Sequence, residues 1–362
     1  NRLHIKICIM NKFWKNKKVL ITGHTGFKGS WLSLFLYVLG AEIYGLSKDK
    51  KDGVYKLAKI KSIFKEEYFY DLGNIELNKL EKILKDVNPN IIFHFAAQAI
   101  VSKGHSDPIE TLNSNIIATL NLLISLDNTS VCNNIVIATT DKVYLNNHKY
   151  NKETDPLGGG DFYSFSKVGV ERVIDIFTSR KENKLCVSVV RSGNVIGGGD
   201  RGEDRLMTDL ITSFIEKKVF QVRNKKSIRP WQYVLDSIYG YLLVGENNLK
   251  IKQGEVFNLN SKLNNKYTVE YLIKEFEKQI QTKLKIKYSS KKFPEMSVLR
   301  LNSDKARKKL NWNTQTSLEE TIEKVVGWEN YYNSSKSSIE FSVLEIKSFI
   351  SENNIDYEIQ KN

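Results

Sequence analysis

The sequence predicts an α/β protein with a doubly wound parallel sheet and a second, smaller domain. The run Lys18–Thr22 is short, apolar and β-branched, and glycines and an apolar helical stretch follow it at once. Strand-like and amphipathic helical segments then alternate as far as about Gly197, which is the pattern of a parallel sheet covered by helices. Beyond that point the alternation stops, and a smaller C-terminal domain is expected.

The strands expected in this sheet are short runs rich in branched aliphatic and aromatic residues. After Lys18–Thr22 they are Glu42–Leu46, Glu67–Tyr70, Ile91–Phe95, Asn134–Ala138, Leu185–Arg191 and Val256–Leu259. Helical periodicity indicates helices at Leu77–Val87, Asn113–Leu126, Ser164–Ser179, Leu206–Lys217, Val269–Ile280 and Leu318–Tyr332.

Three parts of the chain are therefore expected. Residues 11–196 form the first domain, to whose sheet a later strand near 255–260 returns, and residues 197–332 form mainly a substrate-binding domain. Residues 333–362 are polar and are expected to form a loosely attached tail. We interpret Met10 as the natural start, because the residues before it lack the apolar core and the cleavage site of a signal peptide.

The composition argues against several classes of protein. Three scattered cysteines without a CxxC spacing favour a reducing cytoplasm and predict neither a disulfide framework nor a metal site. The longest apolar stretch, Trp31–Leu39, is shorter than the roughly 20 residues of a membrane span, so no membrane partner is expected. The net charge of +14 comes mostly from lysines interleaved with acidic residues, which favours a solvated surface over nucleic-acid binding.

A GxxGxxG spacing joins the first strand to the first helix. In this context glycines permit a tight turn and let backbone amides approach a pyrophosphate at the helix N-terminus. The motif predicts a Rossmann-type dinucleotide site, with a merely structural turn as the alternative. Lys28 either contacts phosphate or is solvated. The residues expected to contact the cofactor are Gly23, Thr25, Gly26, Phe27 and Gly29.

Two acidic residues stand where a dinucleotide would need them. An acidic residue about 20 positions after the glycines commonly holds a ribose diol. Asp49, near the end of the second strand, fits this position best and favours NAD over NADP. Asp71-Leu72 follows the third strand and stands where a residue would contact adenine; an aspartate that only caps a helix is the alternative.

Tyr163 and Lys167 form a YxxxK motif. Residues four apart lie on one face of a helix, so the lysine is expected near the phenol and the cofactor ribose, where it would lower the tyrosine pKa. Thr140, Asp141 and Lys142 directly follow the strand Asn134–Ala138, and polar side chains at the carboxyl end of a parallel strand face the ligand crevice. These two motifs together favour an enzyme.

The combined motifs resemble the extended short-chain dehydrogenases that act on sugar nucleotides. They are the glycine turn, Phe95-Ala96-Ala97-Gln98, Thr140-Asp141-Lys142, the YxxxK pair and Arg191-Ser192-Gly193-Asn194-Val195. The longer strings Gly23–Leu32, Gly197–Asp200 and Ser227–Val234 are similar to the CDP-glucose 4,6-dehydratase family in particular. The similarity runs from about Phe13 to Tyr332.

This resemblance implies an NAD-dependent hydro-lyase that converts CDP-glucose to CDP-4-keto-6-deoxyglucose for deoxysugar and surface polysaccharide synthesis. It implies that Tyr163 is the base, helped by Thr140 and Lys167, that Asp141 protonates the departing 6-hydroxyl, and that Lys142 helps remove the carbon-5 proton. The residues that it implies at the cofactor are Ala96, Ala97, Gln98, Tyr163 and Lys167, and those at the substrate are Asn115, Asn194, Arg205 and Arg229.

The resemblance also implies a homodimer built from the helices at 114–126 and 164–179. Ser102 and His105 depart from the Arg and Tyr that the family commonly shows after Ala-Ala-Gln, and the loop between Tyr144 and Glu153 is shorter than usual. Another sugar-nucleotide dehydratase or an epimerase on the same scaffold is the nearest alternative. A non-catalytic cofactor-binding regulator or a basic nucleic-acid binder is the alternative of a different class.

Overall fold

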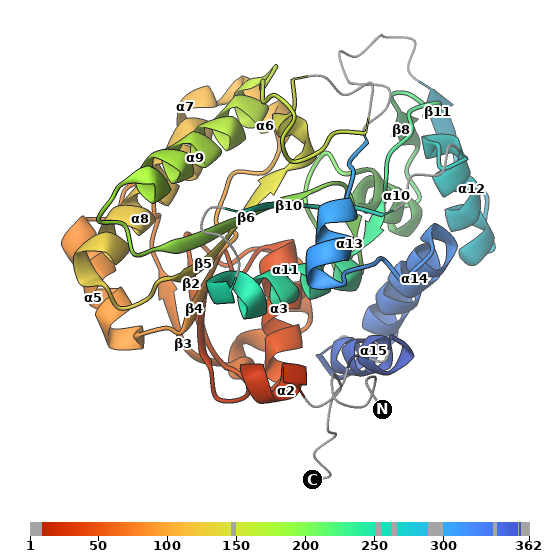
Figure 1. Cartoon of the computed structure of the whole chain (residues 1–362). Coiled ribbons are helices and arrows are strands. Elements are labelled where there is room, and N and C mark those ends of the chain that lie inside the picture. Colours follow the sequence, from red (N-terminus) through yellow and green to blue (C-terminus); the bar gives the residue numbers. More distant parts are fainter. Residues whose placement is uncertain are drawn as a thin grey trace.

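The computed structural model describes residues 9–145, 150–250, 255–261, 266–288, 300–335, 339–353 and 355 (Figure 1). Its centre is a seven-stranded sheet with the order β10-β6-β5-β4-β1-β2-β3, in which every pair of neighbours is parallel. The strands are β1 (Lys18–Thr22), β2 (Glu42–Ser47), β3 (Phe64–Phe69), β4 (Ile91–His94), β5 (Asn134–Thr140), β6 (Cys186–Ser192) and β10 (Val256–Leu259).

The strand order predicts where a ligand binds. From β1 the chain builds outward through β2 and β3 on one side, and then returns to add β4, β5 and β6 on the other side. In such sheets ligands bind outside the carboxyl ends of the strands, at the point where the order reverses. This point lies between β1 and β4, and the glycine turn and the Ala-Ala-Gln segment follow these two strands.

Helices cover both faces of the sheet because its strands are apolar on both sides. Val19 and Ile21 of β1 belong to one buried cluster, while Leu20 between them belongs to the other. The first face carries α2 (Ile9–Trp14), α3 (Phe27–Val38), α11 (Val234–Asn247) and α15 (Ile339–Glu352). The second carries α5 (Leu77–Val87), α8 (Ala118–Thr129) and α9 (Phe162–Ser179), at the left of Figure 1.

A third buried cluster, which includes Met207, Trp231, Leu272 and Phe276, lies at the right of Figure 1. Its elements are α10 (Leu206–Ile215), α12 (Val269–Gln279), α14 (Leu318–Ser335) and the parallel pair β8 (Phe220–Val222) and β11 (Ile286–Tyr288). The remaining elements are α4 (Val54–Leu57), α6 (Val101–Ser106), α7 (Pro108–Leu112), α13 (Asp304–Leu310), β7 (Val195–Ile196) and β9 (Gln232–Tyr233).

Two segments differ from the sequence prediction. The helix expected at Asn113–Leu126 begins as a π-helical turn at Asn113–Ile117 and continues as α8. The expected loose tail instead contains α15, whose buried residues Ile346, Phe349 and Ile350 join the core against α3. Seven of the fourteen residues of α15 are hydrophobic, and the polar average of residues 333–362 hides them. The boundaries at 196 and 332 stay predictions.

One continuous helical segment in the described part of the chain, Pro108–Thr129, is long and apolar enough to cross a membrane by length and composition. Leu122, Leu123 and Leu126 on this segment are fully buried against the sheet and α5. Helices of a protein core commonly pass the same test, so the packing of this segment accounts for its apolar character.

Candidate functional site

The glycine turn is built for close backbone approach. Gly23 has φ +73°, and a Cβ on it would lie 2.6 Å from the Ala96 nitrogen. A Cβ on Gly29 would lie 2.2 Å from the Gly23 carbonyl oxygen, so the first helix packs against the turn only because Gly29 has no side chain. No side chain caps α3 at Gly26, which leaves amides of its first turn free for an anion. These features fit a dinucleotide diphosphate.

The residues expected at the nucleotide lie around this turn. Thr25 donates its Oγ1 proton to the carbonyl of Asp49 at 2.8 Å, which ties the turn to the end of β2. The Asp49 carboxylate is half exposed. Asp71 follows β3 and pairs with Lys48 at 2.9 Å, and Leu72 beside it is buried. The contacts of these side chains with a cofactor stay predictions.

The Ala-Ala-Gln segment follows β4 and is held by a hydrogen-bonded network. Asn115 is buried and both its amide groups are used: Oδ1 accepts from the Gln98 nitrogen at 2.8 Å, and Nδ2 donates to the Gln98 carbonyl at 3.0 Å and to Ser166 at 2.7 Å. Asn115 therefore links the segment containing Ala96 and Ala97 to α9. A direct contact of Asn115 with substrate stays a prediction.

Thr140, Asp141 and Lys142 end β5 at the same edge of the sheet. The Thr140 hydroxyl donates to Asp141 Oδ1 at 3.1 Å, and the Lys142 ammonium lies 3.6 Å from the same oxygen. Asp141 is 2% exposed and Lys142 reaches further out, with 30% of its side chain exposed. The structure thus places a carboxyl and an amine side by side in the crevice.

Tyr163 and Lys167 reach the same place from the first two turns of α9. The Tyr163 hydroxyl is hydrogen-bonded to Thr140 and lies within electrostatic range of Lys142 and Asp141. Lys167 is buried and donates to the Ala138 carbonyl at 3.3 Å. The phenol of Tyr163 therefore meets the hydroxyl, carboxyl and amine of three consecutive residues that lie more than twenty positions before it in the sequence.

Burial controls the protonation of this site. Burial raises the pKa of Tyr163, and the nearby Lys142 charge and the bond with Thr140 oppose that rise without cancelling it. The expected lowering of the tyrosine pKa by the YxxxK lysine is therefore not seen in the protein alone. Burial lowers the pKa of Lys167 to about 8, although Glu171 opposes it. For Lys142, burial acts to lower the pKa, but the charges of Asp141 and Tyr163 outweigh burial, so the pKa of this ammonium is raised.

Lys28 of the glycine motif turns into the crevice rather than into solvent. Its ammonium lies 3.2 Å from the Tyr241 hydroxyl and 5.7 Å from the centre of the Phe95 ring. Burial, followed by the charges of Lys167 and Arg205, lowers its pKa to about 7. Tyr241, on α11, was not singled out in the sequence, because it lies more than two hundred residues from the motif that it contacts.

Three of the residues expected at the substrate, Asn194, Arg205 and Arg229, follow β6 in the chain. Arg229 lies close enough to Lys142 to lower the pKa of that ammonium. Arg205 is near Tyr163, but its guanidinium is held by both oxygens of Asp200 at 2.8 and 2.7 Å. Asn194 follows β6, and its carbonyl accepts from the Gln232 nitrogen at 2.9 Å. Their contacts with substrate stay predictions.

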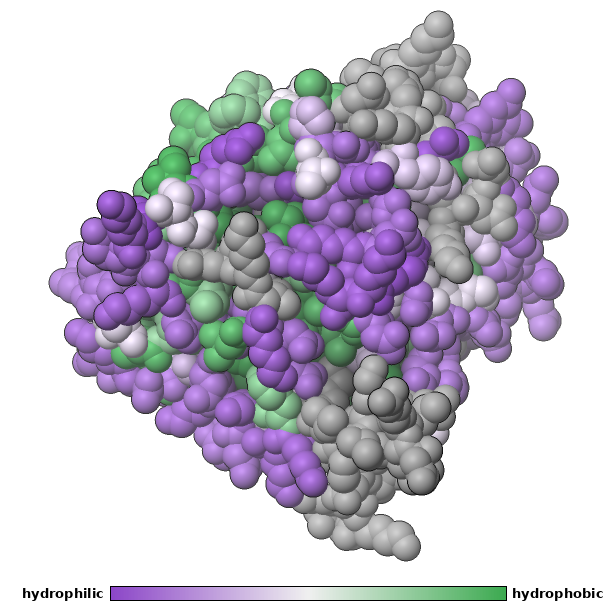
Figure 2. All heavy atoms as spheres, in the orientation of Figure 1, coloured by the Kyte–Doolittle hydropathy of each residue, from purple (hydrophilic) through white to green (hydrophobic). Residues whose placement is uncertain are grey.

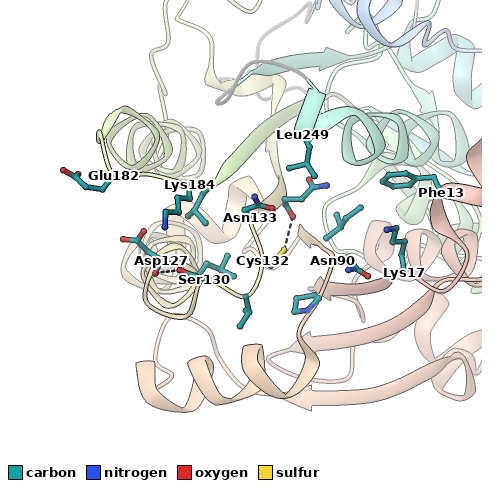
Figure 3. A pocket seen from close by; sticks show the side chains of 16 residues that line it. Phe13, Lys17, Asn90, Asp127, Ser130, Cys132, Asn133, Glu182, Lys184 and Leu249 are labelled. Carbon is teal, nitrogen blue, oxygen red and sulfur yellow. Dashed lines mark hydrogen bonds between the residues drawn. The ribbon is translucent and has the colours of Figure 1, made fainter.

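A separate cavity of about 580 Å³ lies at the opposite edge of the sheet (Figure 3). Residues that precede β1, β4, β5 and β6 line it, among them Lys17, Asn90, Asn133 and Lys184. These are the amino ends of the strands, so none of the predicted site residues reaches it. The described residues contain no cluster of three or more metal-ligating side chains.

Known proteins show the same sequence pattern. Residues 20–325 match the family model described as GDP-mannose 4,6 dehydratase. The CDP-glucose 4,6-dehydratase of Salmonella typhimurium is 32% identical over 95% of this chain and 99% of its own length. The chain belongs to the sugar-nucleotide 4,6-dehydratase family.

Solved structures show the fold of this dehydratase. The epimerase Mth375 from Methanothermobacter thermautotrophicus matches with a TM-score of 0.79 and 20% identity, covering 91% of this chain and 97% of its own. MoeE5 in complex with UDP-glucose and NAD matches with a TM-score of 0.77 and 20% identity, covering 87% of this chain and 99% of its own. At these identities the likeness shows the fold, and the family comes from the sequence relatives.

The departures from the family pattern lie beside the site of the dehydratase. Ser102 on α6 donates to the carboxylate of Asp204, which also pairs with Arg223 at 2.9 Å. This contact joins α6 to the segment before α10. In the short loop after Tyr144, residues 146–149 lie outside the described residues.

Proposed function

We propose that this dehydratase converts CDP-glucose to CDP-4-keto-6-deoxyglucose with NAD as cofactor. The observation that carries the proposal is the group formed by Tyr163, Thr140, Asp141 and Lys142, because an oxidation and a dehydration at neighbouring carbons need a base, an acid and a second base close together. The CDP-sugar rather than another nucleotide is supported by the relative with 32% identity over 95% of the chain.

The chain has the groups that NAD needs. The uncapped first turn of α3 would hold the diphosphate, with Asp49 at the adenosine ribose and Asp71-Leu72 near adenine. Lys167 would hold the nicotinamide ribose beside Tyr163. When bound, NAD accepts hydride from sugar carbon 4 and later returns hydride to carbon 6.

Tyr163 would take the proton from the sugar 4-hydroxyl. Its phenolate is favoured by the charge of Lys142 and by the hydrogen bond with Thr140, while burial opposes it. A positively charged cofactor ring and Lys167 on the same side of the crevice would add to the favourable effects. The resulting ketone at carbon 4 makes the carbon-5 hydrogen acidic.

Asp141 and Lys142 would supply the acid and the base of the dehydration. As an ion pair, a carboxylate and an ammonium, neither is in the form that the step needs. A small approach from their 3.6 Å separation would let one proton pass from Nζ to the carboxyl group, which creates a neutral amine and a carboxylic acid together. The raised pKa of Lys142 opposes this transfer, so bound substrate has to favour it. Lys142 can then remove the carbon-5 proton while Asp141 protonates the departing 6-hydroxyl.

Arginine side chains would hold the substrate diphosphate from the second domain. Arg229 lies on the Lys142 side of the site and offers a fork of donors to phosphate oxygens. Arg205 would have to release or share its pair with Asp200 to do so, and Asn194 would contact the sugar beside the diphosphate.

The test is to incubate the protein and NAD with CDP-glucose, dTDP-glucose, GDP-mannose and UDP-glucose, and to identify products by mass. The expected product is a CDP-sugar lighter by one water, and Tyr163→Phe should form almost none. Loss of water from another sugar only would overturn the nucleotide assignment. A product of unchanged mass would identify an epimerase, and binding without any product would identify a regulator.

A homodimer and a cytoplasmic role in polysaccharide synthesis complete the proposal. Phe162, Phe165 and Ile176 on α9 are 47%, 50% and 65% exposed, and Ile117 before α8 is 39% exposed. Figure 2 shows hydrophobic residues gathered over this part of the surface, at its upper left. An apolar face on two adjacent helices supports a partner that packs on both, as a second copy would in a four-helix interface.

A further inference from the structure

The second oxygen of Asp141 has no hydrogen-bond partner among the described residues. Oδ1 faces Thr140 and Lys142, but Oδ2 is buried and accepts no bond. Leaving a buried carboxylate oxygen without a hydrogen-bond donor costs more free energy than leaving a buried neutral acceptor without one. Oδ2 therefore indicates a place where a ligand oxygen shares a proton with the carboxyl group, as donor to the carboxylate or as acceptor from the acid.

Asn260 presents the complementary group. It follows β10 directly and is 1% exposed. Its Oδ1 accepts from the Ser261 nitrogen at 3.1 Å, while its Nδ2 has no acceptor among the described residues. The sequence alone does not single out this residue, because an asparagine at the end of a strand is usually a turn residue.

Gly193 brings these two atoms to one place. A Cβ on Gly193 would lie 3.2 Å from Asp141 Oδ2 and 3.2 Å from Asn260 Nδ2, so the two atoms are at most twice that distance apart. One oxygen that donates to the carboxylate and accepts from the amide spans such a gap with bonds of about 2.8 to 3.0 Å. A hydroxyl group or water can do both, whereas an ammonium group cannot accept and a carbonyl cannot donate.

We propose that Asn260 and Asp141 form the binding site of the hydroxyl oxygen that leaves sugar carbon 6 as water. This inference rests on the proposed function and adds Asn260 as a substrate-contacting residue. Lys142 first takes the carbon-5 proton, and the electrons of that carbon–hydrogen bond form an enolate with the carbon-4 ketone. The enolate then forms the double bond between carbons 5 and 6 while the carbon–oxygen bond breaks. The electron pair of that bond goes to the oxygen, which takes a proton from Asp141.

The amide of Asn260 would act on the leaving oxygen. Negative charge grows on that oxygen before its protonation is complete, and an N–H donor already in place stabilises this charge. The released water would stay bound between the two side chains until product leaves. Removal of the donor is expected to lower kcat by about tenfold to hundredfold.

The experiment uses the full chain with NAD and two variants that disturb this site differently. Asn260→Leu removes the donor and keeps the approximate size. Gly193→Ala keeps every polar group and adds a methyl group against both free atoms, and φ of Gly193 is not in the left-handed region. Asn247→Leu, at the end of α11 and far from the site, is the matched control.

Both site variants should have a lower kcat for CDP-glucose than the unchanged protein. CDP-xylose lacks carbon 6 and its hydroxyl, so the Kd of both variants for CDP-xylose should stay within about twofold of the value for the unchanged protein. Both should still exchange the carbon-5 hydrogen with deuterated water. An unchanged kcat in Asn260→Leu would overturn the inference. Equal weakening of CDP-xylose binding would also overturn it, because it would indicate general damage to the pocket.

The outcome separates the two proposals. If the unchanged protein dehydrates another sugar nucleotide, the CDP-glucose assignment fails. The role of Asn260 is then tested by measuring kcat with that sugar nucleotide and Kd with its analogue that lacks carbon 6. If the control variant loses as much kcat as Asn260→Leu, the inference is wrong.

Discussion

Glu171 and Arg191 form a bidentate ion pair beneath the residues that we propose as catalytic, with Nε to Oε1 at 2.9 Å and Nη2 to Oε2 at 2.5 Å. Glu171 Oε1 also accepts from Thr139 at 2.8 Å, and Glu171 lies one helical turn after Lys167 on α9. The pair therefore joins α9 to β5 and β6 at the level of the site. Its carboxylate is also the charge that supports the ammonium of Lys167.

Glu171→Gln should destabilise the protein and shift its pH profile. Breaking a buried ion pair costs about 3 to 5 kcal/mol, so the Tm should fall by several degrees or more. The pKa of Lys167 is about 8, and loss of the Glu171 charge lowers it further. If activity needs the ammonium, the fall in kcat/KM at rising pH should move to lower pH. Glu340→Gln on the exposed side of α15 should change neither measurement.

Asp141→Asn and Lys142→Met should stop the reaction at different points. Without the Lys142 amine, the carbon-5 proton is not removed, so recovered sugar should contain no deuterium from the solvent. Without the Asp141 carboxyl, the leaving oxygen lacks its proton donor. Burial then favours the neutral Lys142 amine, because the carboxylate that raised its pKa is gone, so exchange at carbon 5 should remain measurable. Mass spectrometry of sugar recovered from deuterated water checks both. Equal deuterium in the two variants would contradict separate roles.

Lys28→Met should stabilise the protein near neutral pH. The pKa of Lys28 is about 7 in the fold and 10.5 in an unperturbed lysine. Between these values the unfolded chain binds a proton that the folded chain does not, so this lysine makes stability rise as pH rises. The variant lacks this dependence. Its Tm advantage over the unchanged protein should be greatest at pH 7 and shrink toward pH 10; a constant difference would contradict the assignment.

Phe165→Glu should produce monomers if the apolar face of α9 is a dimer interface. A charge at a buried interface residue is strongly unfavourable without a partner. Sedimentation measurements should show half the mass of the unchanged protein. Leu344→Glu, a residue on α15 with 63% exposure, is the matched control and should leave the mass unaltered. A monomeric unchanged protein would contradict the interface.

The sequence predicts the sheet well because buried parallel strands are continuous apolar runs. β1, β10 and α5 have the expected bounds, and the other strands of the sheet differ by a few residues at their ends. α15 was missed because residues 333–362 are polar on average, although seven of the fourteen residues of this helix are hydrophobic. Propensity and composition do not reveal which face of such a helix finds a partner.

The site could be predicted where a motif keeps its residues close together in the sequence. Thr140, Asp141 and Lys142 are consecutive, and Tyr163 and Lys167 are one helical turn apart. Tyr241 and Asn260 come from α11 and the end of β10, and no local pattern relates them to the site. The raised pKa of Tyr163 also depends on burial, which only the packed structure defines.

The edge strand β10 has a consequence for synthesis of the chain on the ribosome. It pairs with β6 along Val256–Leu259, although about sixty residues separate the two strands in sequence. While those residues are still being translated, the backbone of β6 has a free edge that can pair with another nascent chain. Premature termination before residue 256 would leave that edge permanently open, so truncated products should aggregate rather than persist as a folded half.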